Sequence, residues 1–190
     1  MSVEFTKTGL PIATYFSLSK ILWLLRNVDE VNKAKLDNDL CFGTIDSWLL
    51  YKLTGNHVTD VTNASRTLLM DLHTLNWMED VINRLDIPLD SLPSIKPSMF
   101  NYGTNEGILK NVPITAVLGD QQASLFGQNC IASGDVKNTY GTGCFALTNT
   151  GSEIVHSNNG LLSTVAYQKD GEKPQYAIEG SVSIAGAAVQ

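Results

Sequence analysis

Apolar residues recur at three- and four-residue steps in two early segments of the chain, which is the spacing of an amphipathic helix. The first segment ends near residue 27 and has its apolar positions at Leu18, Ile21, Leu22 and Leu25. The second begins near residue 44 and has them at Ile45, Trp48, Leu49 and Leu53. It stops at Thr54-Gly55, and glycine is typical of a helix C-terminus. Both patterns predict core-facing helices, and we expect the two to pack together.

The middle of the chain is more polar. Residues 60–66 are rich in Asp, Thr, Asn and Ser and predict a loop. A short helix is expected over 77–85, before Pro88 and Pro93, and residues 94–111 are expected to be irregular and exposed.

Short apolar runs bounded by turn residues dominate the second half, a pattern that favours strands. Residues 113–118 predict a strand that leads into a helix over 121–126, and residues 136–148 predict two strands joined at Tyr140-Gly141-Thr142-Gly143. Glu179-Gly180-Ser181 predicts a turn into a small-residue helix over 183–190. The chain stops inside this predicted helix, before any cap that would close it, so we expect the chain to be a piece of a longer protein.

Composition narrows the class of protein. The 190 residues are 43% hydrophobic and 17% charged, which is typical of a soluble globular protein. The net charge is −6 and no dense Lys/Arg cluster occurs, so a nucleic-acid partner is not expected. No apolar run reaches the roughly 20 residues needed to span a membrane. Three cysteines without CxxC spacing indicate neither a zinc site nor a disulfide framework, and they favour the cytoplasm.

Asp120 stands where an apolar strand ends and a small-residue helix begins. Ligands tend to bind at this edge of open α/β sheets, and a helix N-terminus favours a carboxylate. Asp120 could therefore accept a proton, or it could cap the helix, because Asp is a preferred N-cap residue. Gln121 and Gln122 favour the first interpretation, since amides are poor caps but good hydrogen-bond partners for hydroxyl groups.

The turn at residues 140–143 has two interpretations as well. Its glycines would let backbone N–H groups face an anion, with the Thr142 hydroxyl beside a phosphate oxygen. A plain hairpin turn explains the same residues. No GxxxxGK[ST] string occurs, so P-loop chemistry is excluded. A base beside a phosphate cradle is what phosphoryl transfer to a hydroxyl group requires.

Many strings of this chain resemble the FGGY family of carbohydrate kinases, and most closely its members that act on glycerol. They lie at residues 7–11, 15–17, 42–49, 60–67, 158–164 and 177–181, and include Gly119-Asp120-Gln121-Gln122 and Lys137-Asn138-Thr139-Tyr140-Gly141-Thr142-Gly143-Cys144-Phe145. The resemblance implies an actin-like, ribonuclease-H-like fold of two α/β domains, incomplete in this chain. Residues 1–130 would form the C-terminal part of the first domain, and residues 131–190 the N-terminal part of the second.

The resemblance also implies site residues and ligands. Asp120 is expected to be the catalytic base for ATP-dependent phosphorylation of glycerol to glycerol 3-phosphate, with Mg²⁺ on the phosphates and no metal held by this chain's own residues. Tyr15, Asp120, Gln121 and Phe145 are expected to contact the substrate. Thr142, Gly186 and Gln190 are expected to contact ATP or ADP. The full-length enzyme is expected to be a cytoplasmic homo-oligomer.

This chain lacks some parts of the family pattern. The first phosphate loop, an Arg-Glu pair, a glycerol-binding Trp and the adenine-contacting region are absent from its sequence. We therefore expect the isolated chain to have no kinase activity. Two alternatives are another polyol or sugar kinase of the same family and a truncated, non-catalytic module.

Overall fold

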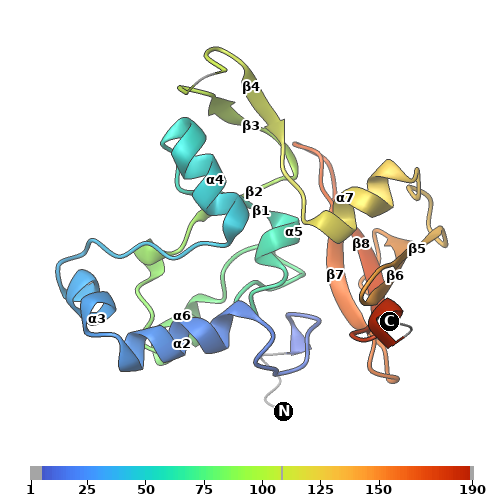
Figure 1. The fold of residues 1–190 in the computed structure, drawn as a ribbon, viewed down its shortest axis with the longest axis horizontal. Coiled ribbons are helices and arrows are strands. Elements are labelled where there is room, and N and C mark those ends of the chain that lie inside the picture. Colours follow the sequence, from blue (N-terminus) through green and yellow to red (C-terminus); the bar gives the residue numbers. More distant parts are fainter. Residues whose placement is uncertain (1–5, 108, 189–190) are drawn as a thin grey trace.

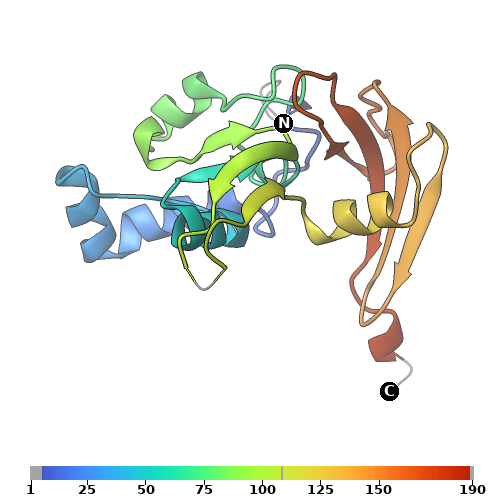
Figure 2. The same ribbon diagram turned by 90° about the horizontal axis from the view of Figure 1, so that it is seen from above.

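The computed structural model describes residues 6–107 and 109–188, which form two parts packed against each other (Figure 1). The first part carries helices around two small sheets. The second part is a four-stranded sheet with one helix, α7, along one of its faces (Figure 2).

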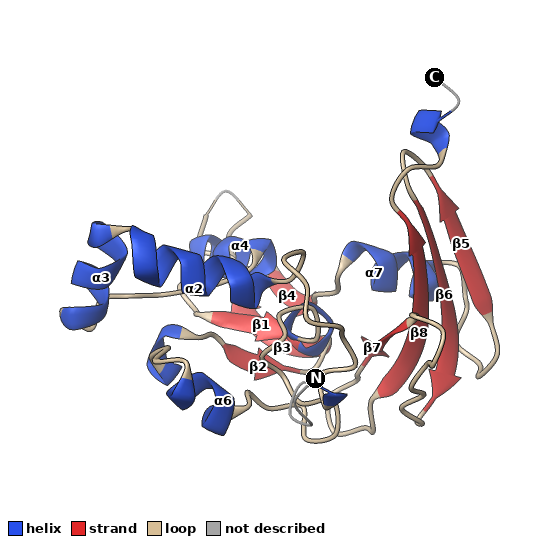
Figure 3. Ribbon diagram, turned by 90° about the horizontal axis from the view of Figure 1, so that it is seen from below, coloured by secondary structure: helices blue, strands red, loops and turns tan. Residues whose placement is uncertain are grey.

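Short elements make up the first part, and Figure 3 shows how its helices surround the small sheets. They are α2 (Ser17–Asn27), α3 (Asp29–Leu36), α4 (Ile45–Thr54), β1 (Val58–Asp60), α5 (Val61–Ala64), α6 (Glu79–Arg84), η1 (Leu89–Ser91), β2 (Ser94–Lys96), β3 (Met99–Thr104) and β4 (Pro113–Ala116). Strands β1 and β2 pair in parallel, whereas β3 and β4 pair antiparallel.

The second part is built on an antiparallel sheet with the strand order β5-β6-β8-β7. Its elements are α7 (Asp120–Gly127), β5 (Val136–Tyr140), β6 (Cys144–Gly151), β7 (Leu162–Tyr167), β8 (Gln175–Val182) and η2 (Gly186–Ala188). Lys137, Leu147 and Glu179 are direct neighbours across β5, β6 and β8, so their side chains share one face. Leu147 packs in a buried cluster with Leu125, which identifies this face as the one that α7 covers.

One apolar cluster joins the two parts. It combines Val61, Met70 and Leu72 of the first part with Val165 and Tyr176 of the sheet. The hydroxyl of Tyr176 also donates to the Leu72 carbonyl oxygen at 2.7 Å, so its only polar atom is satisfied where the ring is buried. The orientation of the sheet relative to the first part is therefore fixed by buried contacts.

The structure confirms the elements predicted from strong periodicity. The helices expected up to residue 27 and from about residue 44 to 54 are α2 and α4, and the helix within 77–85 is α6. The strand-to-helix unit is β4 followed by α7, and the predicted hairpin is β5 and β6. Gly55, in the left-handed conformation, ends α4 as expected.

Two polar segments were predicted wrongly. Residues 60–66 are not simply a loop, because they include the end of β1 and helix α5, and Asp60 is fully buried. Residues 94–111 are not wholly irregular, because they include β2 and β3, and Tyr102 is buried. In the first of these segments the polar side chains bond to backbone and to one another, which hides them from a prediction based on polarity.

Three further predictions were wrong. Helix α4 packs against β1 and β3 rather than α2, and its apolar residues Ile45, Trp48 and Leu49 are 83%, 61% and 54% exposed. The segment 179–181 lies inside β8 instead of forming a turn. Within the described residues up to 188, the expected final helix is only the 3₁₀ turn η2. Helix α3 was not predicted, because it buries no residue and so has no apolar stripe.

We predict that Gly9→Ala lowers the free energy of unfolding by about 3 kcal/mol. Gly9 has a φ of +70°, and a Cβ there would lie 2.5 Å from the Ser163 carbonyl oxygen and 2.6 Å from a Leu72 methyl group. Gly55→Ala is the matched control, because its φ is +73° but a Cβ meets nothing within 4 Å. Its expected cost is about 1 kcal/mol. Urea denaturation measures both, and equal losses would contradict the steric explanation.

Candidate functional site

A cavity of about 590 Å³ lies where the first part meets the covered face of the sheet. Five segments supply its walls: the start of α2, the start of α4, the α5 region, the start of α7 and the sheet. The lining residues are Tyr15, Ser17, Ile45, Asp46, Asn63, Arg66, Leu118, Gly119, Asp120, Gln121, Gln122, Phe145 and Glu179.

Asp120 enters this cavity as the first residue of α7. Its Oδ1 accepts a hydrogen bond from the Gln121 N–H at 2.8 Å, whereas its Oδ2 has only a 3.4 Å contact with Gln121 Nε2. One oxygen therefore satisfies an end group of the helix, and the other is available to a ligand. The carboxylate lies at the N-terminal end of α7, where the helix dipole is positive.

The residue before it, Gly119, is held from two sides. Its N–H donates to Thr62 Oγ1 at 2.8 Å. A Cβ at this position would lie 2.7 Å from Gln122 Oε1, so a side chain would displace Gln122. Only glycine allows the backbone to approach this closely, and this contact sets where Asp120 begins.

Thr62 is in turn held by Asp60, a buried carboxylate that caps α5. Asp60 accepts from the backbone and side chain of Thr62, from the backbone and side chain of Asn63, and from the Ser98 hydroxyl. Burial raises the pKa of Asp60, and these donors oppose the rise. A complete shell of donors thus compensates the cost of a buried charge.

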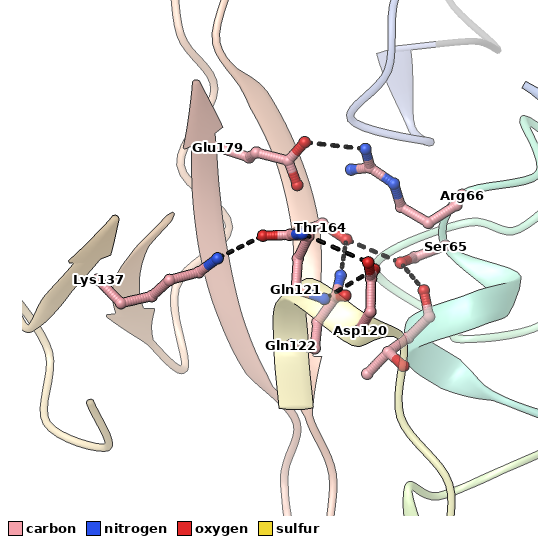
Figure 4. A network of polar contacts seen from close by, with 9 residues as sticks. Ser65, Arg66, Asp120, Gln121, Gln122, Lys137, Thr164 and Glu179 are labelled. Atoms are coloured by element: carbon pink, nitrogen blue, oxygen red, sulfur yellow. Dashed lines mark hydrogen bonds and ion pairs between the residues drawn. The ribbon is translucent and has the colours of Figure 1, made fainter. Parts of the chain in front are cut away.

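A second series of hydrogen bonds joins α7 to both parts of the molecule (Figure 4). Gln122 Nε2 donates to Thr164 Oγ1 at 3.2 Å, and the Thr164 and Ser65 hydroxyls lie 2.9 Å apart. The Ser65 hydroxyl donates to the Thr62 carbonyl oxygen at 2.7 Å. Because the Ser65 hydroxyl has only one hydrogen, the Thr164 hydroxyl must donate to Ser65. The three hydrogen bonds of this series therefore all run in one direction, from Gln122 to the Thr62 carbonyl.

Three charged side chains, Lys137, Glu179 and Arg66, lie at the sheet side of the site (Figure 4). Lys137 Nζ donates to Gln121 Oε1 and, at 2.8 Å, to Thr139 Oγ1. Burial lowers the pKa of Lys137, while Glu179 and Asp120 oppose this effect. Arg66 pairs with the buried carboxylate of Glu179 at 3.0 Å.

Four predicted site residues are brought together. Tyr15, Asp120, Gln121 and Phe145 all line the cavity. Tyr15 is 70% exposed, and the Lys20 ammonium fixes its loop by donating to the carbonyl oxygens of Thr14 and Tyr15 at 2.6 and 2.5 Å. The structure thus places a carboxylate, an amide, a phenol and an aromatic ring around one space.

Two of the predicted nucleotide-binding residues, Thr142 and Gly186, do not line this cavity. Thr142 and Gly186 are close to each other at the β5–β6 turn, where the Ala185 N–H donates to the Thr142 carbonyl oxygen at 2.8 Å and the Gly186 N–H to that of Gly141 at 3.0 Å. A Cβ on Gly186 would lie 2.5 Å from the Gly141 carbonyl oxygen. Gln190 is outside the described residues.

Five residues around the cavity were missed as site residues: Asp60, Arg66, Gln122, Lys137 and Glu179. An Asp followed by Thr and Asn at the start of a short helix is a capping signal that could have identified Asp60. A lysine at an inward position of a strand could have identified Lys137. Among the described residues, no group of three or more His, Cys, Asp or Glu side chains is placed to hold a metal ion. None of the described helices has the length and apolar character to cross a membrane.

The class of protein follows from a family match. Residues 3–127 match the N-terminal domain of the FGGY family of carbohydrate kinases. This match covers well over half of the chain, so the protein belongs to this family. The expected actin-like α/β fold is confirmed, and the chain represents only part of it.

Individual relatives narrow the comparison further. A glycerol kinase of Brucella anthropi is 55% identical over 97% of this chain. The crystal structure of Plasmodium falciparum glycerol kinase with ADP superimposes with a TM-score of 0.93 at 44% identity over 98% of this chain. A xylulose kinase from Rhodospirillum rubrum, at 19% identity and a TM-score of 0.83, shares the fold. The chain spans 38% of the length of each of the three.

We predict that Asp60→Asn lowers the free energy of unfolding by about 3 kcal/mol. A backbone N–H points at each oxygen of Asp60, Thr62 N at Oδ2 and Asn63 N at Oδ1, so either orientation of an Asn amide sets a donor against a donor. Asp46→Asn is the matched control, because Asp46 accepts from two threonine hydroxyls, and these can rotate. Thermal and urea unfolding measure both variants, and a loss for Asp46→Asn as large as that for Asp60→Asn would contradict this account.

Proposed function

We propose that, within a full-length protein of this family, the cavity around Asp120 binds glycerol and supports transfer of the γ-phosphoryl group of ATP to it. The products would be sn-glycerol 3-phosphate and ADP. The observation that carries the proposal is the Asp120 carboxylate beside Gln121, Tyr15 and Phe145 in one cavity, with an Oδ2 whose one contact, from Gln121 Nε2, is long at 3.4 Å. The glycerol kinases among the relatives support the choice of substrate.

Asp120 acts as the general base in this proposal. Its Oδ2 takes the proton of a terminal hydroxyl group while that oxygen forms a bond to the γ-phosphorus, and the bond from phosphorus to the ADP oxygen breaks. The transition state of this reaction is loose, so the protein mainly positions the reactants and balances charge. A base at hydrogen-bond distance contributes about 10² to 10⁴ in rate.

The remaining cavity residues orient the substrate. The Tyr15 hydroxyl and the Gln121 amide are hydrogen-bond partners for the other hydroxyl groups, and the Phe145 ring packs against the carbon chain. A small polyol presents both kinds of surface, which matches a cavity with polar and aromatic walls.

The nucleotide would lie toward the β5–β6 turn. Thr142, Gly186 and Gln190 are the proposed contacts because they match the family pattern, and Gly186 packs closely on the backbone of Gly141 beside Thr142. Mg²⁺ would enter with ATP and would neutralise charge on its phosphates, and such a site needs only one or two protein carboxylates and no cage of protein ligands. All three cysteines are free, as in a cytoplasmic enzyme. Homo-oligomeric assembly of the full-length protein stays a prediction.

A substrate panel tests the proposal. We expect a full-length chain of the relatives' size that contains these 190 residues to phosphorylate glycerol with a higher kcat/KM than xylulose or gluconate, measured by coupled ADP release. A preference for xylulose or gluconate would favour another sugar kinase of the family. No turnover of any substrate, with no heat of binding for glycerol or ATP in calorimetry, would favour a non-catalytic module.

We predict that Asp120→Asn in the same full-length protein lowers kcat by about 10² to 10⁴. The KM for ATP should not change, because the side chain meets the alcohol and not the nucleotide. Asp170→Asn is the matched control, since Asp170 is exposed in the turn between β7 and β8 and should leave kcat unaltered. Steady-state kinetics measure both, and an unchanged kcat for Asp120→Asn would rule out the base assignment.

A further inference from the structure

Lys137 is a buried lysine that the proposed reaction does not use. It is 2% exposed on β5 and projects from the covered face of the sheet toward the first turn of α7 (Figure 4). Its ammonium group contacts Gln121 Oε1 and Thr139 Oγ1, both uncharged oxygens. Among the described residues it forms no ion pair with a carboxylate.

Stability does not explain a lysine in this position. Burial of an ammonium group costs free energy, and two neutral acceptors compensate it less well than a carboxylate does. Glu179 lies on the same face of the sheet, but Arg66 pairs with its Oε1. An apolar side chain packed against Leu147 would suit this face better, so the ammonium group calls for a functional reason.

The chemistry of the contact supplies one. A lysine ammonium group only donates hydrogen bonds, whereas a glutamine amide has one accepting oxygen and one donating nitrogen. With Lys137 on one side of Gln121, the oxygen of the amide must face the lysine. The NH₂ group must then face the other way, and it lies there 3.4 Å from Asp120 Oδ2 in the wall of the cavity.

We propose that Lys137 is a positioning residue that fixes the orientation of the Gln121 amide, so that this side chain presents a donor, never an acceptor, to the substrate. The proposal rests on the function proposed above. Asp120 then requires a group that gives up a proton, and Gln121 requires one that accepts a hydrogen bond. Two neighbouring hydroxyl groups of a polyol satisfy both at once, so the pair selects a vicinal diol.

A double-mutant cycle in the full-length protein tests this. Lys137→Met should raise the KM for glycerol about tenfold, the effect of losing one hydrogen bond from the Gln121 amide to the substrate, and leave the KM for ATP unchanged. In a Gln121→Ala background, Lys137→Met should have no further effect on the KM for glycerol, because there is no amide left to orient. Lys169→Met is the matched control, since Lys169 is a half-exposed lysine outside the cavity, paired with Glu172.

Two outcomes of the cycle would overturn the proposal. One is an unchanged KM for glycerol in Lys137→Met, and the other is an equal effect of Lys137→Met with and without Gln121. If Lys137→Met fails to fold, Gln121→Glu replaces it. Glu keeps a partner for the lysine but offers the substrate only acceptors, so the KM for glycerol must rise, and a wild-type value would overturn the proposal.

A measurement that needs no turnover separates this proposal from the proposed function. In protein labelled with ¹⁵N at glutamine side chains, the Gln121 amide signals are those lost in Gln121→Ala. These signals should shift in Lys137→Met and stay unchanged in Lys169→Met, whichever substrate the enzyme uses. Signals that stay in place in Lys137→Met would overturn the role of Lys137, whereas a full-length protein inactive on glycerol but with shifted signals would overturn only the substrate assignment.

Discussion

The buried carboxylate of Asp60 is connected to four segments of the chain. It accepts from the start of its own helix and from Ser98, whose hydroxyl in turn accepts from the Gln168 N–H at 3.3 Å. Through Thr62 Oγ1 it is also connected to Gly119 and so to the start of α7. A buried charge is tolerable only when its donors are all in place, so these segments must assemble together. The position of Asp120 follows from this requirement.

The second constraint is the row of Lys137, Leu147 and Glu179 across three strands. Leu147 anchors the sheet to α7 through apolar contact with Leu125. Its neighbours Lys137 and Glu179 place a positive and a negative charge on either side of this contact. Arg66 balances Glu179 from the first part of the molecule. Charges in such a poorly hydrated place act more strongly than on the surface, so their arrangement affects every group in the cavity.

Sequence reasoning succeeded where one physical signal dominated. The spacing of apolar residues located α2 and α4, and the strand-to-helix junction put Asp120 at the head of α7. It failed where polar side chains are buried, as at Asp60, because composition does not reveal whether a polar group has partners. It also failed for the packing of α4, because the spacing of apolar residues predicts a helix but not the elements against which the helix packs. A strand pattern can mark Lys137 as inward-facing, but its contact with Gln121, and that of Gln122 with Thr164, join distant segments and are in no local pattern.

The apolar cluster shared by residues 61–72 with Val165 and Tyr176 has a consequence for how the molecule can be divided. If a protease cuts the backbone in the loop between α7 and β5, each piece keeps one half of an interlocking surface that only the other half fits. The two pieces then have reason to stay together as a non-covalent pair. The two parts are therefore joined by buried packing as well as by the backbone, even though the ribbon looks like two units.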